Sequence, residues 1–496
     1  MSKYKSFFYI SSSLLFIIFL ISKYLTINTM YIGGHDTFQY IHWSDILLTE
    51  ERNLIFFRPV LYLIVFIFHN FFDWSPLAFK YMLIFFSSGS FIILCAILKK
   101  LRTSIYKNLL ILLSYIFSIS FLVADAVGHI TAIENFFVFL ILFISLNLIR
   151  KKSFLNYFLF FLTAISMTFV HEEKFLYAVL LIFVIEKNLI TSLKLVFLLC
   201  LITIIGYLII GGQTVDNNSA KIASSIALSW GNHLYFINNI IDTFQSAMNQ
   251  FGFIQSVLCL FIFLYVIKIW ITDAISLYKS NPTNNFYNNL IKLYELLFHN
   301  NLLTRDVSVL LIPSIFYFIL IGIIFAGLDL PRTTSPIMFP ILIGAIVLIL
   351  NYKAFETSKI LVTLFFILSA LLNLYKSIID IDKHDFEEEK YANAFSLLKQ
   401  SGYKCSVSRK IGIDQSFEDR PPMWGGSDNK YGLSSKVYMG SCAEKILLEN
   451  SNDLREYGAI VFYKDNLSEV QTYTEFEGNP DWKKLSNKNV IIFLRR

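Results

Sequence analysis

The sequence predicts an α-helical polytopic membrane protein of about 11 transmembrane helices, followed by a small extracytoplasmic α/β domain. Of its 496 residues, 55% are hydrophobic and only 16% are charged, and the mean hydropathy is +0.58. Soluble domains carry about 25% charged residues. Apolar stretches long enough for a bilayer recur up to residue 379, and charged and turn-forming residues return beyond residue 380.

The candidate spans are segments that mostly contain the ~17–25 apolar residues needed for one crossing. They lie at residues 7–23, 77–98, 108–125, 135–149, 154–170, 174–187, 193–210, 251–270, 307–326, 335–351 and 359–377. Segment 54–72 is different, because only ten uncharged residues separate Arg58 from His69. An apolar run of ~10–14 residues is more often interfacial than spanning. We therefore predict a juxtamembrane helix there.

The distribution of Lys and Arg predicts the topology. Basic residues gather in alternate loops, and basic loops face the cytoplasm. This pattern places the N-terminus in the cytoplasm only if segment 54–72 does not cross. The predicted topology places outer loops at 24–76 and 211–250. The change in composition beyond residue 379 divides the chain into a membrane domain, 1–379, and an extracytoplasmic domain, 380–496.

Charge also argues against several classes of protein. The net charge of +6 is small and resides in short loops, which argues against nucleic-acid binding. No Asp, Glu, Lys or Arg lies in the middle of a predicted span. Ion-coupled pumps and transporters place ionisable groups near the bilayer midplane. The ionisable groups here gather at the outer rims, at the depth of a lipid headgroup.

The first outer loop carries two candidate site residues. Asp36 follows two glycines just beyond a span, and a carboxylate held there could act as a general base. It could equally cap a helix over 37–49, with Gln39 completing a capping box. Asp45 fits an exposed residue of that helix. Arg58, next to Pro59, could bind a phosphate in bidentate fashion, or could be a snorkelling interfacial anchor.

Three further outer segments hold candidates. Asp125, His129 and Glu134 could position an acceptor or bind a divalent cation, or form an ordinary acidic loop. A charged break between two apolar segments consists of His171, Glu172, Glu173 and Lys174, and would be costly unless functional or self-paired. Arg332 begins a proline-rich span on a face where positive charge is disfavoured, which suggests a phosphate ligand instead of a topology anchor.

The hydrophilic tail contains two cysteines and several short strand-like segments. Cys405 and Cys442 are the only cysteines outside the apolar spans, so they could form a disulfide in an oxidising compartment. Alternating or apolar patterns predict strands near 404–412, 457–463 and 490–494.

In the order and spacing of these elements, the chain resembles the GT-C membrane glycosyltransferases, which include lipid A aminoarabinose transferase and protein O-mannosyltransferases. The resemblance covers about residues 7–350 and rests on GGHDTFQYIHWSDIL, FFRPVLYL, HITAIEN, FVHEEKFLY and PRTTSPIMFP. It implies an integral protein of the bacterial inner (plasma) membrane. That protein would transfer a sugar from a polyprenyl-phosphate donor to a hydroxyl of a surface glycan or lipid acceptor.

The resemblance also implies roles for individual residues. Asp36 would be the catalytic base, with Glu134 as the second catalytic candidate. Arg58, Arg332 and Lys174 would bind the donor phosphate. The residues that would contact the acceptor, or form a structural polar turn, are His171, Glu172, Glu173, Asp125 and His129. Family members often carry an acidic pair in the first loop, where His35 precedes Asp36 here, so a divalent cation remains an open possibility.

The layout of the C-terminal domain is similar to that of phage-type O-antigen glucosyltransferases, which suggests modification of lipopolysaccharide O-antigen. A glycan polymerase is also conceivable, but such enzymes usually show a large outer loop rich in Arg, and 211–250 contains none. A flippase or transporter of lipid-linked sugars would predict ionisable residues at the midplane, which the predicted spans lack. A non-catalytic membrane scaffold is the third competing hypothesis.

Overall fold

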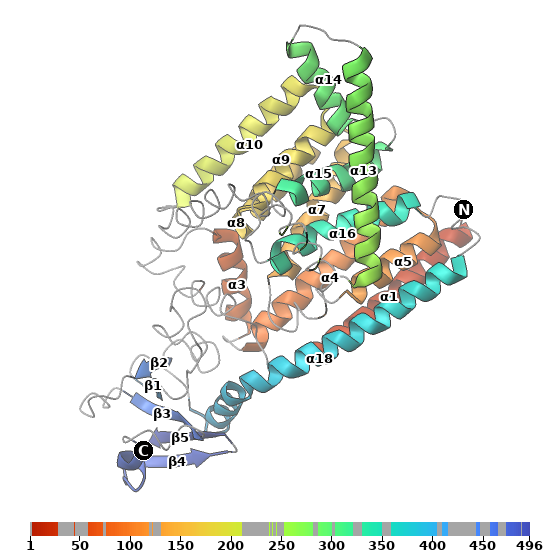
Figure 1. The fold of residues 1–496 in the computed structure, drawn as a ribbon. Coiled ribbons are helices and arrows are strands. Elements are labelled where there is room, and N and C mark those ends of the chain that lie inside the picture. The colour runs from red at the N-terminus through yellow and green to blue at the C-terminus, as the bar shows by residue number, and fades with distance from the viewer. Residues whose placement is uncertain are drawn as a thin grey trace.

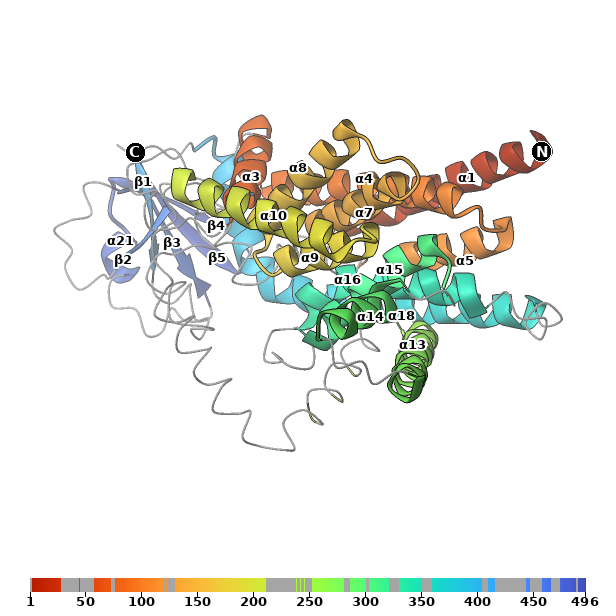
Figure 2. The same ribbon diagram turned by 90° about the horizontal axis from the view of Figure 1, so that it is seen from above.

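The computed structural model confirms the predicted fold class: a long bundle of apolar helices is followed by a small C-terminal sheet (Figure 1). The structure describes residues 2–27, 44, 58–72, 76–118, 122, 130–210, 238, 241, 245, 252–280, 286–299, 303–320, 330–349, 359–403, 409–414, 443–446, 457–464, 473–487 and 489–496. The N-terminus and the sheet lie at opposite ends of the bundle in Figures 1 and 2.

Each of the predicted spans overlaps a helix over the residues that the structure describes. The helices are α1 (Ser2–Ile27), α3 (Pro59–Phe71), α4 (Pro76–Leu101), α5 (Ile105–Ile116), α7 (Thr131–Leu148), α8 (Phe154–Val170), α9 (Lys174–Ile185), α10 (Leu189–Ile210), α13 (Phe253–Ser280), α14 (Phe286–Phe298), α15 (Arg305–Tyr317), α16 (Leu330–Ile349) and α18 (Lys359–Gln400). Within the described residues, five are long and apolar enough to cross a membrane: α4, α7, α10, α13 and α18. This is the architecture of an integral membrane protein.

Helix α3 is the short segment that the sequence sets apart. Pro59 occupies its first turn, where a missing N–H costs nothing. Its 13 residues span about 20 Å, less than the ~30 Å of a hydrocarbon core. Figures 1 and 2 show α3 lying across the direction of α1 and α4, at the end of the bundle next to the sheet. Helix α14, between α13 and α15, was not predicted.

The bundle core consists almost entirely of Leu, Ile, Val, Phe and Tyr contributed by most of the helices. Two of the glycines lie where neighbouring helices come close together. A Cβ on Gly89 of α4 would lie 2.7 Å from the Phe136 ring of α7, and a Cβ on Gly344 of α16 would lie 2.4 Å from Leu311 of α15. Real Cβ atoms essentially never come that close to another atom, so a larger residue at either position would force the Phe136 or Leu311 side chain to shift.

The C-terminal domain is a mixed sheet with strand order β2-β1-β3-β5-β4. Its strands are β1 (Lys410–Asp414), β2 (Ala443–Ile446), β3 (Tyr457–Tyr463), β4 (Trp482–Ser486) and β5 (Val490–Arg495). Strand β1 pairs in parallel with β2 and β3, and β5 is antiparallel to β3 and β4. The apolar runs of β3 and β5 therefore form the middle of the sheet, where both faces are covered.

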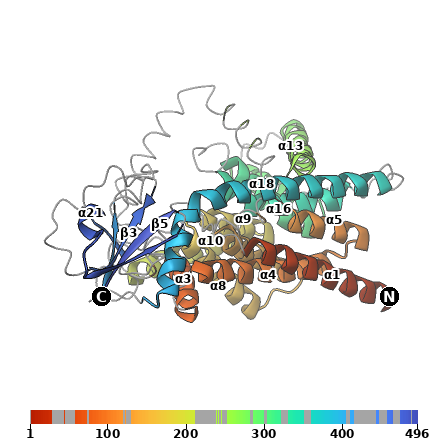
Figure 3. The same ribbon diagram turned by 90° about the horizontal axis from the view of Figure 1, so that it is seen from below.

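Alternate residues of these two strands face different surroundings. Val461 and Ile492 belong to a buried cluster that also contains Leu398 of α18 and Leu61 of α3. Their neighbours along the strands pack instead against Phe476 on the other face. Figure 3 shows α18 running from the far end of the bundle to the sheet as one helix. The sheet is thus packed onto the membrane domain through the last turns of α18.

Candidate functional site

Three segments that are far apart in the sequence meet at the end of the bundle next to the sheet. They are the start of α3, the first turn of α7, and the turn between α8 and α9, and the last residue of α15 packs against them. We call this group the sheet-side cluster, and define it as Arg58, Glu134, His171, Glu172, Glu173, Lys174 and Tyr317. The α8–α9 turn is tight because the N–H of Lys174 bonds to the His171 carbonyl at 3.0 Å. The four ionisable residues at 171–174 therefore stay together instead of spreading along a loop.

Arg58 and Glu172 form a two-point ion pair. The Arg58 Nε donates to Glu172 Oε2 at 3.2 Å, and Nη2 donates to Oε1 at 3.4 Å. The guanidinium is mostly buried, with 18% of the side chain exposed, whereas 46% of the Glu172 side chain is exposed. Burial by itself would raise the pKa of Glu172, but the Arg58 charge and its hydrogen bonds hold that pKa below its ordinary value.

Glu134 and Lys174 form a second pair, which lies deeper. Lys174 Nζ is 3.7 Å from Glu134 Oε2, and neither side chain has any exposed surface. Glu134 lies in the first turn of α7, where the helix dipole favours a negative charge. Neither carboxylate oxygen of Glu134 accepts a hydrogen bond from the described residues. The ammonium, the helix dipole and the more distant Arg58 charge are what favour a charged carboxylate at this buried position.

Tyr317 of α15 contacts the ammonium, and Tyr177 of α9 packs against the Tyr317 ring. Lys174 Nζ lies 3.4 Å from the Tyr317 hydroxyl and 5.2 Å from the centre of its ring. The Tyr177 ring meets Tyr317 edge-on, and the Tyr177 hydroxyl is 3.1 Å from Ser314 Oγ. Sequence patterns did not reveal Tyr177, Ser314 and Tyr317, because a functional Tyr or Ser in an apolar helix looks the same in sequence as one that only packs in the core.

Glu173 and His171 complete the turn. His171 Nδ1 lies 3.7 Å from Glu173 Oε2. Burial raises the pKa of Glu173, although the nearby Lys174 acts in the opposite direction. The two adjacent carboxylates thus differ in character: Glu172 is charged and pairs outward with Arg58, whereas Glu173 lies on the buried side.

Two lysines that sequence reasoning did not single out, Lys23 near the end of α1 and Lys80 near the start of α4, are also buried.

The structure thus brings together Arg58, Glu134 and the 171–174 turn from among the predicted site residues. Asp36, Asp125, His129, Cys405 and Cys442 lie outside the described residues. Arg332 belongs to the first turn of α16, and its side chain is outside the described part. Within the part that is described, no group of three or more His, Cys, Asp or Glu is arranged to hold a metal ion.

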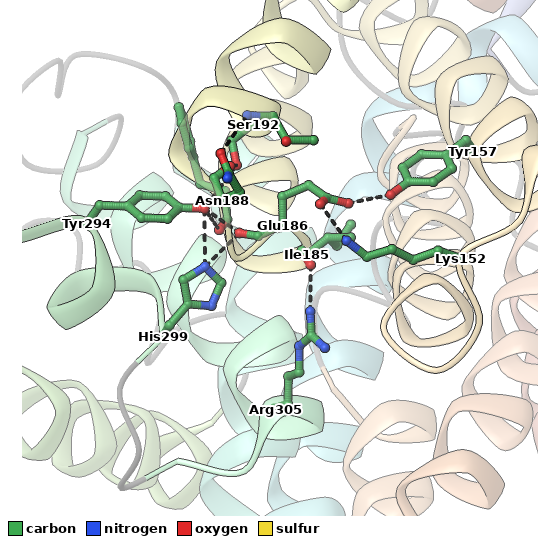
Figure 4. Close-up of polar contacts among 11 residues, drawn as sticks. Lys152, Tyr157, Ile185, Glu186, Asn188, Ser192, Tyr294, His299 and Arg305 are labelled. Carbon is green, nitrogen blue, oxygen red and sulfur yellow. Dashed lines mark hydrogen bonds and ion pairs between the residues drawn. The ribbon is translucent and has the colours of Figure 1, made fainter. Parts of the chain in front are cut away.

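A second polar cluster lies at the other end of α9, about 18 Å along its axis from Lys174 (Figure 4). Glu186, which is buried, accepts hydrogen bonds from Lys152 and Tyr157. Arg305 donates to the Ile185 carbonyl at 2.7 Å, and His299 Nε2 is 2.7 Å from the Glu186 carbonyl. These contacts satisfy carbonyls that a helix C-terminus leaves open, so the cluster is a cap that ties α9 to α14 and α15.

Comparison with known proteins gives similarity in structure only. No family model matches the sequence, and no curated protein matches it. The chain is similar to the crystal structure of ArnT from Cupriavidus metallidurans bound to undecaprenyl phosphate, with a TM-score of 0.43 and 10% identity over 97% of each chain. For the apo state of ArnT the TM-score is 0.40 and the identity 9%, again over 97% of each chain. The residues of the sheet-side cluster are therefore the main guide to function.

Proposed function

We propose that this chain is a membrane glycosyltransferase of the GT-C type. It transfers a sugar from a polyprenyl-phosphate donor, at the outer leaflet, to a hydroxyl of a surface glycan or lipid, such as lipopolysaccharide O-antigen. The observation that carries the proposal is the convergence of Arg58, Glu134 and the 171–174 turn at one end of the helix bundle. Such a transfer requires a cation that binds the donor phosphate and a carboxylate that accepts the acceptor proton.

The position of the cluster favours an enzyme over a transporter. Its cations and carboxylates lie at helix ends, beside the end of the bundle that carries the C-terminal sheet. A substrate whose phosphate is at headgroup depth and whose prenyl chain is in the bilayer would meet these residues from the side. The C-terminal domain would then lie beside the acceptor.

The chemistry is a substitution at the anomeric carbon of the donor sugar. The acceptor oxygen forms a bond to that carbon, the bond from the carbon to the phosphate oxygen breaks, and polyprenyl phosphate leaves. The acceptor proton passes to a carboxylate, which we assign to Asp36, with Glu134 as the second candidate. Arg58 and Arg332 stabilise the charge that develops on the leaving phosphate, which is the largest contribution that fixed donors can make. Attack opposite the phosphate inverts the anomeric carbon.

Lys174 has a more restricted position than Arg58. Its ammonium contacts Glu134 and Tyr317 and is fully buried, so it would reach a phosphate only if the pair with Glu134 opened. Arg58 is therefore the stronger candidate for a phosphate ligand. In this arrangement the role of Lys174 is to favour the charged form of Glu134, which is the form that can accept a proton.

The test is sugar transfer from a labelled polyprenyl-phosphate sugar in membranes, normalised to the amount of protein. Asp36→Asn keeps a helix cap but cannot accept a proton. We expect it to lower kcat by ~10²–10⁴, the usual contribution of a general base, while donor binding is retained. Asp45→Asn is the matched control, because it removes a carboxylate from the same loop and should leave transfer unchanged. Near-normal transfer by Asp36→Asn would refute this assignment and direct attention to Glu134.

A further inference from the structure

The Arg58–Glu172 pair has the geometry in which a guanidinium binds a phosphate. Two N–H groups of Arg58 point at two oxygens of one anion, at 3.2 and 3.4 Å. An arginine fork binds carboxylate and phosphate oxygens in the same two-point fashion. Without a donor, the group that we assign to the phosphate is therefore already occupied by an anion of the chain itself.

We propose that Glu172 is an exchangeable counter-anion, which occupies Arg58 in the absence of donor and which the lipid phosphate displaces. The proposal rests on the proposed function and deepens it, because it assigns a regulatory role at the same site. The incoming ligand is a phosphate monoester or diester carried on a lipid, and the residue that yields to it is Glu172.

Exposure supports the exchange. Glu172 exposes 46% of its side chain, so once displaced it can turn into water or the headgroup layer at little cost. Ion pairs at that level of exposure are weak. A polyprenyl phosphate carries at least as much charge and is also held in place by its prenyl chain. The buried Glu134–Lys174 pair cannot exchange in this way, because separating it would leave two uncompensated charges inside the protein.

The backbone supports it as well. Arg58 immediately precedes α3, so its Cα is fixed by the start of a helix while its guanidinium reaches across to the α8–α9 turn. Glu172 lies in a turn that is held by its own backbone, because the N–H groups of 174, 175 and 176 bond to the carbonyls of 171, 172 and 173. The exchange thus requires only a rotation of the Glu172 side chain. After transfer, its return to Arg58 would help to expel the polyprenyl phosphate.

The experiment measures the binding of undecaprenyl phosphate, without sugar, to the purified full-length protein in lipid nanodiscs. Four forms are compared: wild type, Glu172→Gln, Arg58→Gln and the double variant. If Glu172 competes for Arg58, Glu172→Gln should bind roughly 1.4–5-fold more tightly than wild type, the range expected when a weak competing ion pair is removed. Arg58→Gln should bind more weakly, and adding Glu172→Gln to it should restore nothing.

A matched control exists at the other end of the bundle. Arg150 Nη2 and Asp306 Oδ2 form another partly exposed arginine–carboxylate pair at 2.7 Å. Asp306→Asn removes one carboxylate from that pair and should leave the affinity for the lipid unchanged. A gain equal to that of Glu172→Gln would mean that only the overall charge matters, and would overturn the proposal.

The remaining outcomes separate this inference from the proposed function. If Arg58→Gln weakens binding but Glu172→Gln does not strengthen it, the assignment of Glu172 as a counter-anion is wrong. The assignment of Arg58 as the residue that binds the phosphate is then retained. A gain by Glu172→Gln that persists in the Arg58→Gln background also overturns the exchange. If Arg58→Gln binds like wild type, the proposed phosphate ligand itself fails. Inorganic phosphate that competes as strongly as the lipid would show that the ligand is free phosphate, and would overturn the lipid assignment.

Discussion

The buried Glu134–Lys174 pair gives the sharpest prediction about stability. Removing the charge of one partner, by Glu134→Gln or by Lys174→Met, leaves the other charge inside the bundle without compensation. Removing both charges leaves no stranded ion. We expect each single variant to be strongly destabilised, and we expect the double variant to recover most of the stability of wild type.

The magnitude follows from the separation and the burial. At 3.7 Å and an effective dielectric constant of about 20, two unit charges attract by about 4–5 kcal/mol. Breaking a buried pair costs about 3–5 kcal/mol, whereas replacing both partners is often nearly neutral. The stranded group can also change its protonation state, which sets an upper limit on the loss. If each single variant loses about 3 kcal/mol, the lower end of that range, and the double variant is nearly neutral, the coupling between the two positions should be about 6 kcal/mol.

The assay is thermal or denaturant unfolding of the purified protein in detergent for the four members of the double-mutant cycle. The partly exposed Arg150–Asp306 pair serves as the reference, because its atoms are closer, at 2.7 Å, and yet its coupling should be only about 0.2–1 kcal/mol. We therefore expect the buried pair to have the larger coupling energy, although its atoms are farther apart. Additive losses at Glu134 and Lys174, or single variants as stable as wild type, would refute the reasoning.

Three further predictions concern the cations, the tail and pH. Arg332→Lys should raise KM for the lipid donor because the bidentate fork is lost, and Arg332→Ala should raise it more; unchanged kinetics in both would make Arg332 a topology anchor. Cys405 and Cys442 should form a disulfide worth about 3–4 kcal/mol in the chain-entropy model, and mass spectrometry that finds two free thiols in protein from its native compartment would exclude it. Because Arg58 holds the pKa of Glu172 below its ordinary value, their contact should stabilise the fold fully above about pH 4.3 and be lost as pH falls through the lowered pKa. Melting temperatures of wild type and Arg58→Gln should therefore converge on acidification, and a widening difference would contradict this.

The sequence by itself determined the class of the molecule and the approximate location of most of its helices. Long apolar runs can satisfy their backbone groups in a membrane only by forming helices, so composition and length are sufficient to place them. The ten uncharged residues between Arg58 and His69 were enough to single out α3, and the apolar runs 457–463 and 490–494 were enough to find β3 and β5. These signals are local, which is why they can be read without a fold.

Only the tertiary structure decided which charged groups share a site. Glu172 and Glu173 are neighbours in the chain, but one pairs with Arg58, 114 residues away, and the other lies against His171 on the buried side. The contacts of Lys174 with Glu134 and with Tyr317 also join residues that are far apart in the sequence. Charge pairing depends on separation in space and on the local dielectric, and both are set by how the helices pack. A linear pattern of acids and bases therefore predicts that a polar site exists, but packing decides which residues are partners and which of them can exchange with a ligand.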